Sequence, residues 1–202
     1  MREASSHRAR KALDVLARML DVSDPDTGEH ARDVAECVPR AGVVLGLSSD
    51  ELEQLELAAR FHDIGKIAVP EDVLRKPGPL DDSEREVMAC HVEWGAELLR
   101  HLPGCEPIAH IVRHHHEQYN GGGYPDGLAD GEIPLASRII AACDAYGAMV
   151  SDRPYRPALA PHRAVEELRR GSGSQFDPEA VGAVLHALGE TPSQNGRAHS
   201  YR

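Results

Sequence analysis

A histidine directly followed by an aspartate is the first pattern in this sequence that could do chemistry. His62 and Asp63 are adjacent at the end of an apolar stretch, and Ile64-Gly65-Lys66 follows them. Imidazole nitrogen and carboxylate oxygen suit hydrolytic metals such as Fe, Mn, Zn and Co. The dipeptide by itself is more often a capping aspartate beside a surface histidine. A metal site at this position therefore needs ligands from elsewhere in the chain.

Candidate ligands recur on separate segments of the chain, which has twelve histidines. Asp26 and His30 are four residues apart, so a helix would point both side chains the same way. Buried carboxylates are costly unless they are paired or bound to a metal. Several such residues on different helices favour one metal centre built from inward side chains of a helical bundle. The further candidates are His91, the run His114-His115-His116-Glu117, and Asp144.

Helical periodicity surrounds these residues. No alternating strand pattern of useful length is present, and the scarcity of aromatic residues (one Trp, two Phe) indicates a core of Ala, Leu, Val and Ile, which suits packed helices. The sequence therefore predicts an all-α bundle of eight to ten helices, with residues 119–135 as a Gly-rich loop. Helices are expected over 8–21, 27–45, 48–61, a short turn from 70, 82–100, 106–116, 133–151, 161–170 and 177–188.

Charge and composition exclude several classes of function. The net charge of −11 argues against binding to nucleic acid polymers or anionic membranes, which requires clustered Lys and Arg. No apolar run is long enough for a membrane span, and the N-terminus shows no secretory signal, so a cytoplasmic protein is expected. The cysteines form no CxxC pair and are interpreted as reduced, mostly buried thiols: Cys37, Cys90, Cys105 and Cys143.

The candidate ligands belong to an ordered series of motifs. In chain order these are His62-Asp63 with Ile64-Gly65-Lys66, Lys76-Pro77-Gly78, His91, His115-His116-Glu117, Asn120 to Leu128 with Gly-Tyr-Pro at its centre, Ile133 to Ile139, Asp144, Ser151 to Arg156, and Phe176-Asp177-Pro178. The series resembles the HD-GYP family, a subgroup of the HD phosphohydrolases whose members are metal-dependent bacterial phosphodiesterases of cyclic di-GMP. The resemblance runs from about Asp24 to Leu188 and implies an HD-domain helical bundle with a Gly-Tyr-Pro loop.

The resemblance also implies roles for individual residues. Asp63 would bridge two divalent ions, most commonly Fe or Mn, and Asp26 stands where some members have a Glu that supports a third. Lys66 would lie near the scissile phosphate. Tyr124, Arg153 and Arg156 match positions that contact the dinucleotide. The full set of implied metal ligands is Asp26, His30, His62, Asp63, His91, His115, His116 and Asp144.

The implied activity is hydrolysis of cyclic di-GMP to pGpG, GMP or both by a hydroxide that bridges the metal ions. Two alternatives stay open. The chain could be a non-catalytic module that binds the dinucleotide or docks a partner, or an HD phosphohydrolase for another nucleotide. A homodimer and a separate sensor or receiver protein are further partners that the resemblance suggests.

The chain departs from the family pattern at two positions. Asn120 replaces a common Asp in the glycine-rich loop, and Asn-Gly is expected to keep the turn. Gly147 stands where the family usually has a second Asp. This position is not that of a metal ligand, so catalysis is expected to be retained. The predicted division is an N-terminal linker or helix over 1–22, a catalytic domain over 23–190 and a disordered tail over 191–202.

Overall fold

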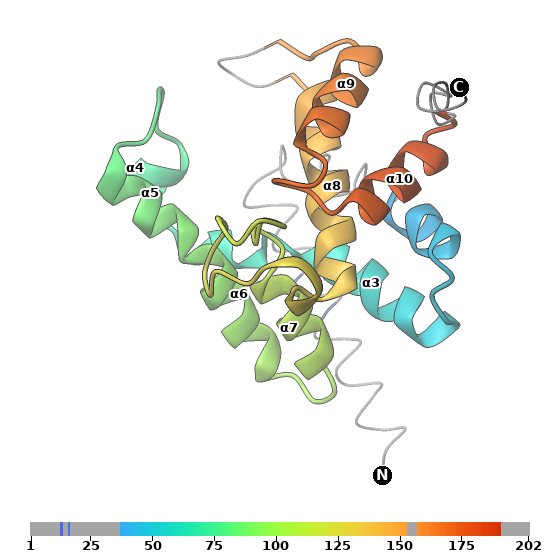
Figure 1. The fold of residues 1–202 in the computed structure, drawn as a ribbon. Helices are drawn as coiled ribbons and strands as arrows, with labels where there is room; N and C mark the ends of the chain where they lie inside the picture. The colour runs from blue at the N-terminus through green and yellow to red at the C-terminus, as the bar shows by residue number, and fades with distance from the viewer. Residues whose placement is uncertain (1–12, 14–15, 17–36, 153–156, 191–202) are drawn as a thin grey trace, which may run out of the picture.

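Helices make up all of the regular structure that can be described in this protein. The computed structural model describes residues 13, 16, 37–152 and 157–190 (Figure 1). Within those ranges the β-type pairing is limited to two isolated bridges, Asn120 with Ala129 and Ser172 with Phe176. The predicted all-α class is therefore confirmed.

The elements follow one another closely along the chain. Residues 37–44 are helical, and Gly46 has a positive φ of 76° just after them. The elements that follow are α3 (Ser49–Phe61), η1 (Ile64–Ala68), α4 (Glu71–Leu74), α5 (Asp82–Ala89), α6 (His91–Arg100), α7 (Glu106–Arg113), η2 (Asp130–Glu132), α8 (Leu135–Val150), α9 (Pro161–Gly171) and α10 (Pro178–Ala187).

Capping residues fix the starts of three helices where the sequence predicts them. Ser48 and Glu51 form a reciprocal capping box at α3, and Asp81 with Glu84 forms another at α5. The Asp177 side chain accepts a hydrogen bond from the backbone N–H of Glu179 at the start of α10. Such caps satisfy backbone N–H groups that have no partner within the helix. The local sequence therefore determines these boundaries.

Two predicted helices are corrected by the structure. The helix expected over 82–100 is two helices that meet at Cys90, and the helix expected over 106–116 ends at Arg113. At both places the helical hydrogen bonds span three residues in place of four: the Cys90 N–H donates to the Val87 carbonyl, and the His114 N–H donates to the Ile111 carbonyl. Each break comes immediately before candidate ligands, at His91 and at His115, and periodicity alone could not show it.

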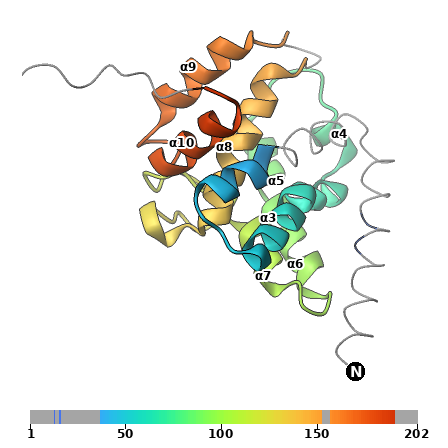
Figure 2. The same ribbon diagram turned by 90° about the vertical axis from the view of Figure 1, so that its right-hand side faces the viewer.

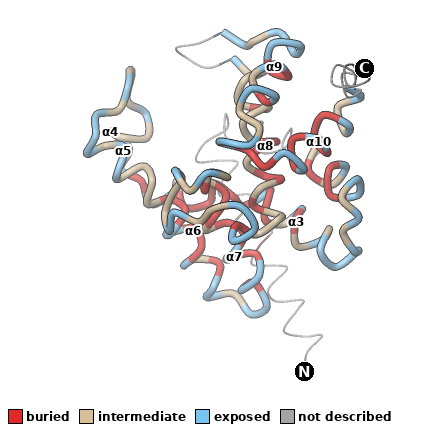
Figure 3. Tube along the Cα trace, in the orientation of Figure 1, coloured by how far each residue is buried: buried red, intermediate tan, exposed pale blue. Residues whose placement is uncertain are grey.

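The core lies where α3, α6, α7 and α8 meet. Helix α6 packs on α7 and on η1, α3 packs on α7, and α8 packs on α9 and α10. The buried segments in Figure 3 gather at this junction, and Figure 2 shows the same helices from the side. The largest fully buried apolar side chains include Leu55, Phe61, Ile64, Leu99 and Ile139. By contrast α4 and α5 have no buried residue and extend away from the body in Figure 1.

Several predictions fall outside the described residues. These include most of the expected helix over 8–21, the start of the helix over 27–45, and the tail over 191–202. Leu13 and Leu16 are described as helical, and Leu13 is buried in the core. None of the described helices combines the length and the apolar character that crossing a bilayer requires.

Candidate metal centre

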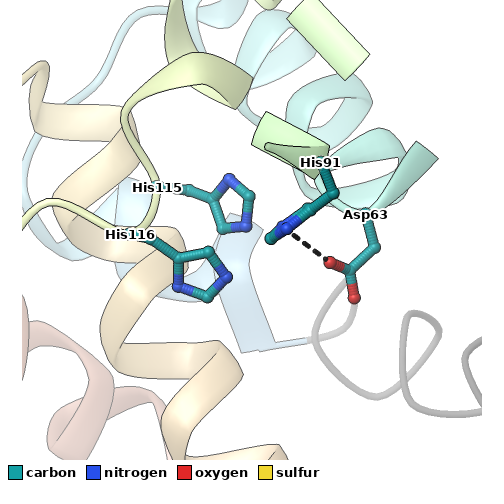
Figure 4. Close-up of side chains that lie close together, drawn as sticks. All are labelled: Asp63, His91, His115 and His116. Atoms are coloured by element: carbon teal, nitrogen blue, oxygen red, sulfur yellow. Dashed lines mark ion pairs between the residues drawn. The ribbon is translucent and has the colours of Figure 1, made fainter. Parts of the chain in front are cut away.

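Four potential ligands from three segments converge at the core. Asp63 follows α3, His91 is the first residue of α6, and His115 with His116 lies in the turn after α7 (Figure 4). One ligand atom from each residue lies within 4.8 Å of the others. Asp63, His91 and His115 are buried, so the site has the dry surroundings in which charge is usually neutralised by a partner or a cation.

Three imidazoles are oriented by the same local contact. The Nδ1 atoms of His62, His91 and His115 each lie 2.7 Å from the carbonyl oxygen three residues earlier, that of Ala59, Met88 and Val112. A carbonyl only accepts, so Nδ1 is the donor and, in the neutral ring, Nε2 keeps its lone pair. This is the orientation by backbone carbonyls that metal-binding histidines require.

The Nε2 atoms of two of these rings face the common space. Those of His91 and His115 are buried and have no hydrogen-bond partner among the residues that the structure describes. The His91 Nε2 atom lies 3.3 Å from Oδ1 of Asp63, which is the contact drawn in Figure 4. The His116 ring lies beside that of His115, with centroids 4.1 Å apart. Buried nitrogens with a free lone pair next to a carboxylate fit a divalent cation.

The other oxygen of Asp63 faces a second group of side chains. Its Oδ2 lies 3.3 Å from Nε2 of His62, and that nitrogen lies 3.7 Å from Oδ1 of Asp144 on α8. The Lys66 Nζ atom is 2.6 Å from the same Oδ2. Asp63 therefore stands between two sets of candidate ligands, one on each of its oxygens. This is the arrangement a bridging carboxylate needs.

Burial keeps most of these rings neutral. It lowers the pKa of His91, lowers that of His116 to about 4, and holds that of His115 well below its ordinary value, since the neighbouring rings add to the effect. Neutral imidazole is the form that binds a metal. These three residues therefore need no deprotonation at neutral pH.

His62 behaves in the opposite way. Burial alone would lower its pKa, but the carboxylates of Asp63 and Asp144 outweigh burial and raise it to about 10. Burial would likewise raise the pKa of Asp63, but Lys66 and His62 hold it well below the ordinary range. Without a cation, His62 is thus protonated and balances the charge of Asp63. A bound divalent ion would take over that role.

The Gly-Tyr-Pro loop closes over the histidines. The Tyr124 and His116 ring centroids are 5.0 Å apart, and the backbone N–H of Tyr124 donates to the His116 carbonyl at 3.3 Å. Burial and the nearby carboxylates raise the pKa of Tyr124, so its hydroxyl stays protonated. Gly123 lies directly on the backbone of Glu117 and Gln118, where an added Cβ would come within 2.2 Å of the Gln118 nitrogen. The glycine therefore permits the close approach of the loop.

A salt bridge that the sequence reasoning missed anchors this loop. Arg113 donates through Nε and Nη2 to the two oxygens of Asp126, at 2.8 Å each, and through Nη1 to Glu93 at 3.0 Å. The Asp126 N–H donates to Glu117 at 2.8 Å. Neither Arg113 nor Asp126 carries a signal that distinguishes it from an ordinary surface charge in the sequence. Only the fold brings them together.

His114 is placed differently from its two neighbours. Its Nδ1 lies 2.8 Å from the carbonyl of His110, and its Nε2 lies 2.9 Å from Oδ2 of Asp126. Both ring nitrogens are engaged away from the centre, in the loop anchor. Asn120, the departure in the same loop, accepts a hydrogen bond from the Gly122 N–H at 3.0 Å, so the expected turn forms.

The structure thus gathers seven of the predicted site residues. These are His62, Asp63, Lys66, His91, His115, His116 and Asp144, with Tyr124 beside them. Asp26, His30, Arg153 and Arg156 lie outside the described residues. Their predicted roles stay predictions.

Comparison with known proteins relates this chain to one family. The family model described as "HD domain" matches residues 14–180. A curated relative, "Cyclic di-GMP phosphodiesterase response regulator RpfG" of Xanthomonas campestris pv. campestris (strain 8004), is 40% identical over 88% of this chain and 48% of its own length. The "3'3'-cGAMP-specific phosphodiesterase 2" of Vibrio cholerae serotype O1 is 34% identical over 84% of this chain and 33% of its own.

The solved structures agree on the fold. A crystal structure titled as a cyclic GMP-AMP specific phosphodiesterase of V. cholerae (V-cGAP3) superimposes with a TM-score of 0.68 at 22% identity, over 88% of this chain and 48% of that one. At that identity the likeness shows the fold. The chain spans from one third to about half the length of the curated relatives RpfG and phosphodiesterase 2.

Proposed function

Because the chain belongs to the HD domain family, whose model matches residues 14–180, we propose that it is a metal-dependent phosphodiesterase that hydrolyses cyclic di-GMP to pGpG, GMP or both. The observation that carries the proposal is the convergence of three carbonyl-oriented imidazoles around Asp63: His62 and His91 face its two oxygens, and His115 lies within 4.8 Å. Relatives named as cyclic di-GMP phosphodiesterases support the choice of substrate, among them one of Thermotoga maritima that is 36% identical over 87% of this chain.

Two divalent cations, Fe or Mn, are the cofactors that we assign to this site. One would be held by His91, His115 and His116 with one oxygen of Asp63. The other would be held by His62 and Asp144 with the second oxygen. His30 is a further ligand in this proposal, and Asp26 would support a third ion. When bound, such ions neutralise charge on a phosphodiester and lower the pKa of water.

The chain's own side chains have separate tasks in the proposed reaction. Lys66 lies beside Asp63, where its ammonium can offset charge on the non-bridging phosphate oxygens. Tyr124, half-buried next to His116, offers a ring on which a guanine can stack, a contact typically worth about 1–3 kcal/mol. Arg153 and Arg156 are assigned to the phosphates. These cations let an acidic chain attract an anionic substrate locally.

Single-turnover assays test the proposal directly. The 202-residue chain, purified without oxygen and loaded with Mn(II) or Fe(II), should convert cyclic di-GMP to a linear product. Chromatography separates and quantifies substrate and product. Asp63→Asn and His62→Ala should abolish turnover. Asp82→Asn makes the same amide change at a side chain that is 95% exposed on α5, and it should leave the rate unchanged.

The same assay decides between the enzyme and the alternatives. Binding of cyclic di-GMP to metal-loaded protein without any product would contradict catalysis and indicate a sensing module. Faster turnover of 3'3'-cGAMP would transfer the substrate assignment to that dinucleotide, for which the relative from V. cholerae is named. Localisation in the cytoplasm, as the sequence predicts, is a further proposal. A homodimer and a sensor or receiver partner are proposals that follow from the family membership.

A further inference from the structure

Two cysteines far apart in the sequence are adjacent in the fold. Cys143 lies on α8 and Cys37 lies in the helical segment 37–44, and their sulfur atoms are 3.4 Å apart. A disulfide bond is about 2.05 Å long, so the sulfur atoms must approach by little more than an ångström. The four cysteines are free thiols in the structure, with Cys105 and Cys143 buried and Cys37 and Cys90 half-buried. Their distance in sequence gave no sign of this pair.

The two thiols differ in how far they are buried. Cys143 is 1% exposed, whereas Cys37 is half-buried. Both line a cavity of about 210 Å³, together with Arg40, Tyr146 and Leu188. A small thiol-reactive molecule could therefore reach Cys37 first, while Cys143 stays shielded behind it. The Cys143 thiol donates a hydrogen bond to the Cys37 sulfur, and this contact lowers the pKa of Cys37.

We propose that Cys37 and Cys143 form a site of reversible oxidation, at which a low-molecular-weight disulfide such as glutathione disulfide converts the two thiols into one intramolecular disulfide. The Cys37 thiolate attacks one sulfur of glutathione disulfide, which forms a mixed disulfide and releases one glutathione thiolate. The Cys143 thiol, 3.4 Å away, then attacks the Cys37 sulfur, and its proton passes to the departing sulfur of the second glutathione. Two protein thiols are oxidised and one glutathione disulfide is reduced to two thiols.

The disulfide would link the helical segment 37–44 to α8 next to the candidate metal centre. Cys143 precedes Asp144, the α8 residue that faces His62. The two cysteines are 106 residues apart, so the bond would close a long loop and restrict the unfolded chain. The oxidised protein should therefore be more stable to heat than the reduced protein. We expect its Tm to rise by roughly 5–15 °C.

Mass spectrometry of the full chain tests the site. Mn(II)-loaded protein is incubated with glutathione disulfide, its free thiols are alkylated, and the peptides are mapped without reduction. The wild type should lose two hydrogen atoms and yield a cross-linked peptide pair containing Cys37 and Cys143, which dithiothreitol reverses. Cys143→Ser should stop at the mixed disulfide and gain one glutathionyl group on Cys37. Cys90→Ser removes another half-buried thiol and should cross-link like the wild type.

Three results would overturn the proposal. The first is that all four thiols of the wild type remain alkylatable at a large excess of glutathione disulfide. The second is a cross-link that involves Cys90 or Cys105 in place of the assigned pair. The third is an oxidised wild type whose Tm is equal to or below that of the reduced protein. The wild-type peptide map is decisive even if a cysteine variant fails to fold.

Discussion

The imidazole of His62 meets different requirements in the metal-free and the metal-bound protein. Without a metal, Asp63 and Asp144 raise its pKa to about 10, so the ring is protonated at neutral pH. As a ligand it must be neutral. Its Nδ1–H is already committed to the Ala59 carbonyl, so the proton that leaves must come from Nε2. Metal and proton therefore compete for one nitrogen.

This competition predicts that metal binding releases about one proton at pH 8. The other three rings are held neutral by burial and release none. Because His62 is protonated in the metal-free fold at every pH below its pKa of about 10, metal affinity should rise with pH up to about 10, by up to tenfold per pH unit. Titration calorimetry of metal-free protein with Mn(II), in two buffers of different ionisation enthalpy, counts the protons. His62→Gln should reduce the count by about one, and a wild-type count of zero would contradict the assignment.

The stability of the metal-free protein should depend on pH with the opposite sign. The pKa of His62 is higher in the folded chain than its ordinary value of 6.5. Its attraction to the two carboxylates is therefore fully present below about pH 6.5 and is lost as the pH rises towards 10. Between about pH 6.5 and 10, the metal affinity thus rises with pH while the free energy of unfolding of the metal-free protein falls.

Element packing brings the ligands into one place. Gly65 in η1 lies directly on the first turn of α6, where a Cβ would come within 1.9 Å of the His91 carbonyl oxygen and 2.6 Å of the Gly95 nitrogen. Both contacts are with backbone, which cannot rotate away. The glycine thus lets the segment after Asp63 approach the helix that begins at His91. The distance between these two ligands depends on this contact.

We expect Gly65→Ala to destabilise the protein by about 3 kcal/mol or more, since the clash is with backbone in a packed core. Metal content should fall as well, because η1 and α6 must separate. Gly182→Ala is the matched control: this α10 glycine has open space around it, and alanine there should stabilise by about 0.5–1 kcal/mol. Urea denaturation and elemental analysis measure both effects. A Gly65→Ala protein with wild-type stability and metal content would refute the role of this contact.

On the scale of the whole molecule, the site links elements from most of the described chain. The ligands follow α3, begin α6, follow α7 and lie within α8. A cation held by all of them binds the folded chain far better than the unfolded one, so it stabilises the fold by mass action. The net charge of −11 adds to this, because the acidic chain repels itself less when cations are bound.

Removal of metal should therefore lower the Tm. At about a hundredfold excess of Mn(II) over its Kd, the stabilisation is about 2.7 kcal/mol, or roughly 5–10 °C for a chain of this size. Scanning calorimetry with Mn(II) and with chelator measures the difference. His115→Ala should abolish the rise in Tm on addition of Mn(II). His114→Ala should keep it, because the His114 ring nitrogens are engaged with His110 and Asp126. Loss of the response in both variants would contradict this division between adjacent histidines.

The sequence by itself determined the class of the fold and named the candidate ligands that the structure brings together. Capping residues such as Ser48 and Asp81 specify helix starts through contacts within one turn, and His62-Asp63 is a local motif whose spacing can be read directly. These features depend on neighbours in the chain. For that reason the helix starts at 49, 82 and 178 agree with the sequence prediction to within one residue.

Only the tertiary structure decided which residues meet. Arg113 meets Asp126 to anchor the loop, and Cys37 meets Cys143, although nothing in the local sequence of either segment predicts its partner. The helix breaks at Cys90 and Arg113 were likewise not predictable from the local pattern. The different roles of His114 and His115 have the same origin: the His114 ring contacts Asp126 of the loop, whereas the next ring, that of His115, lies against His62. Packing in three dimensions sets these contacts, and the local periodicity of the chain does not contain that information.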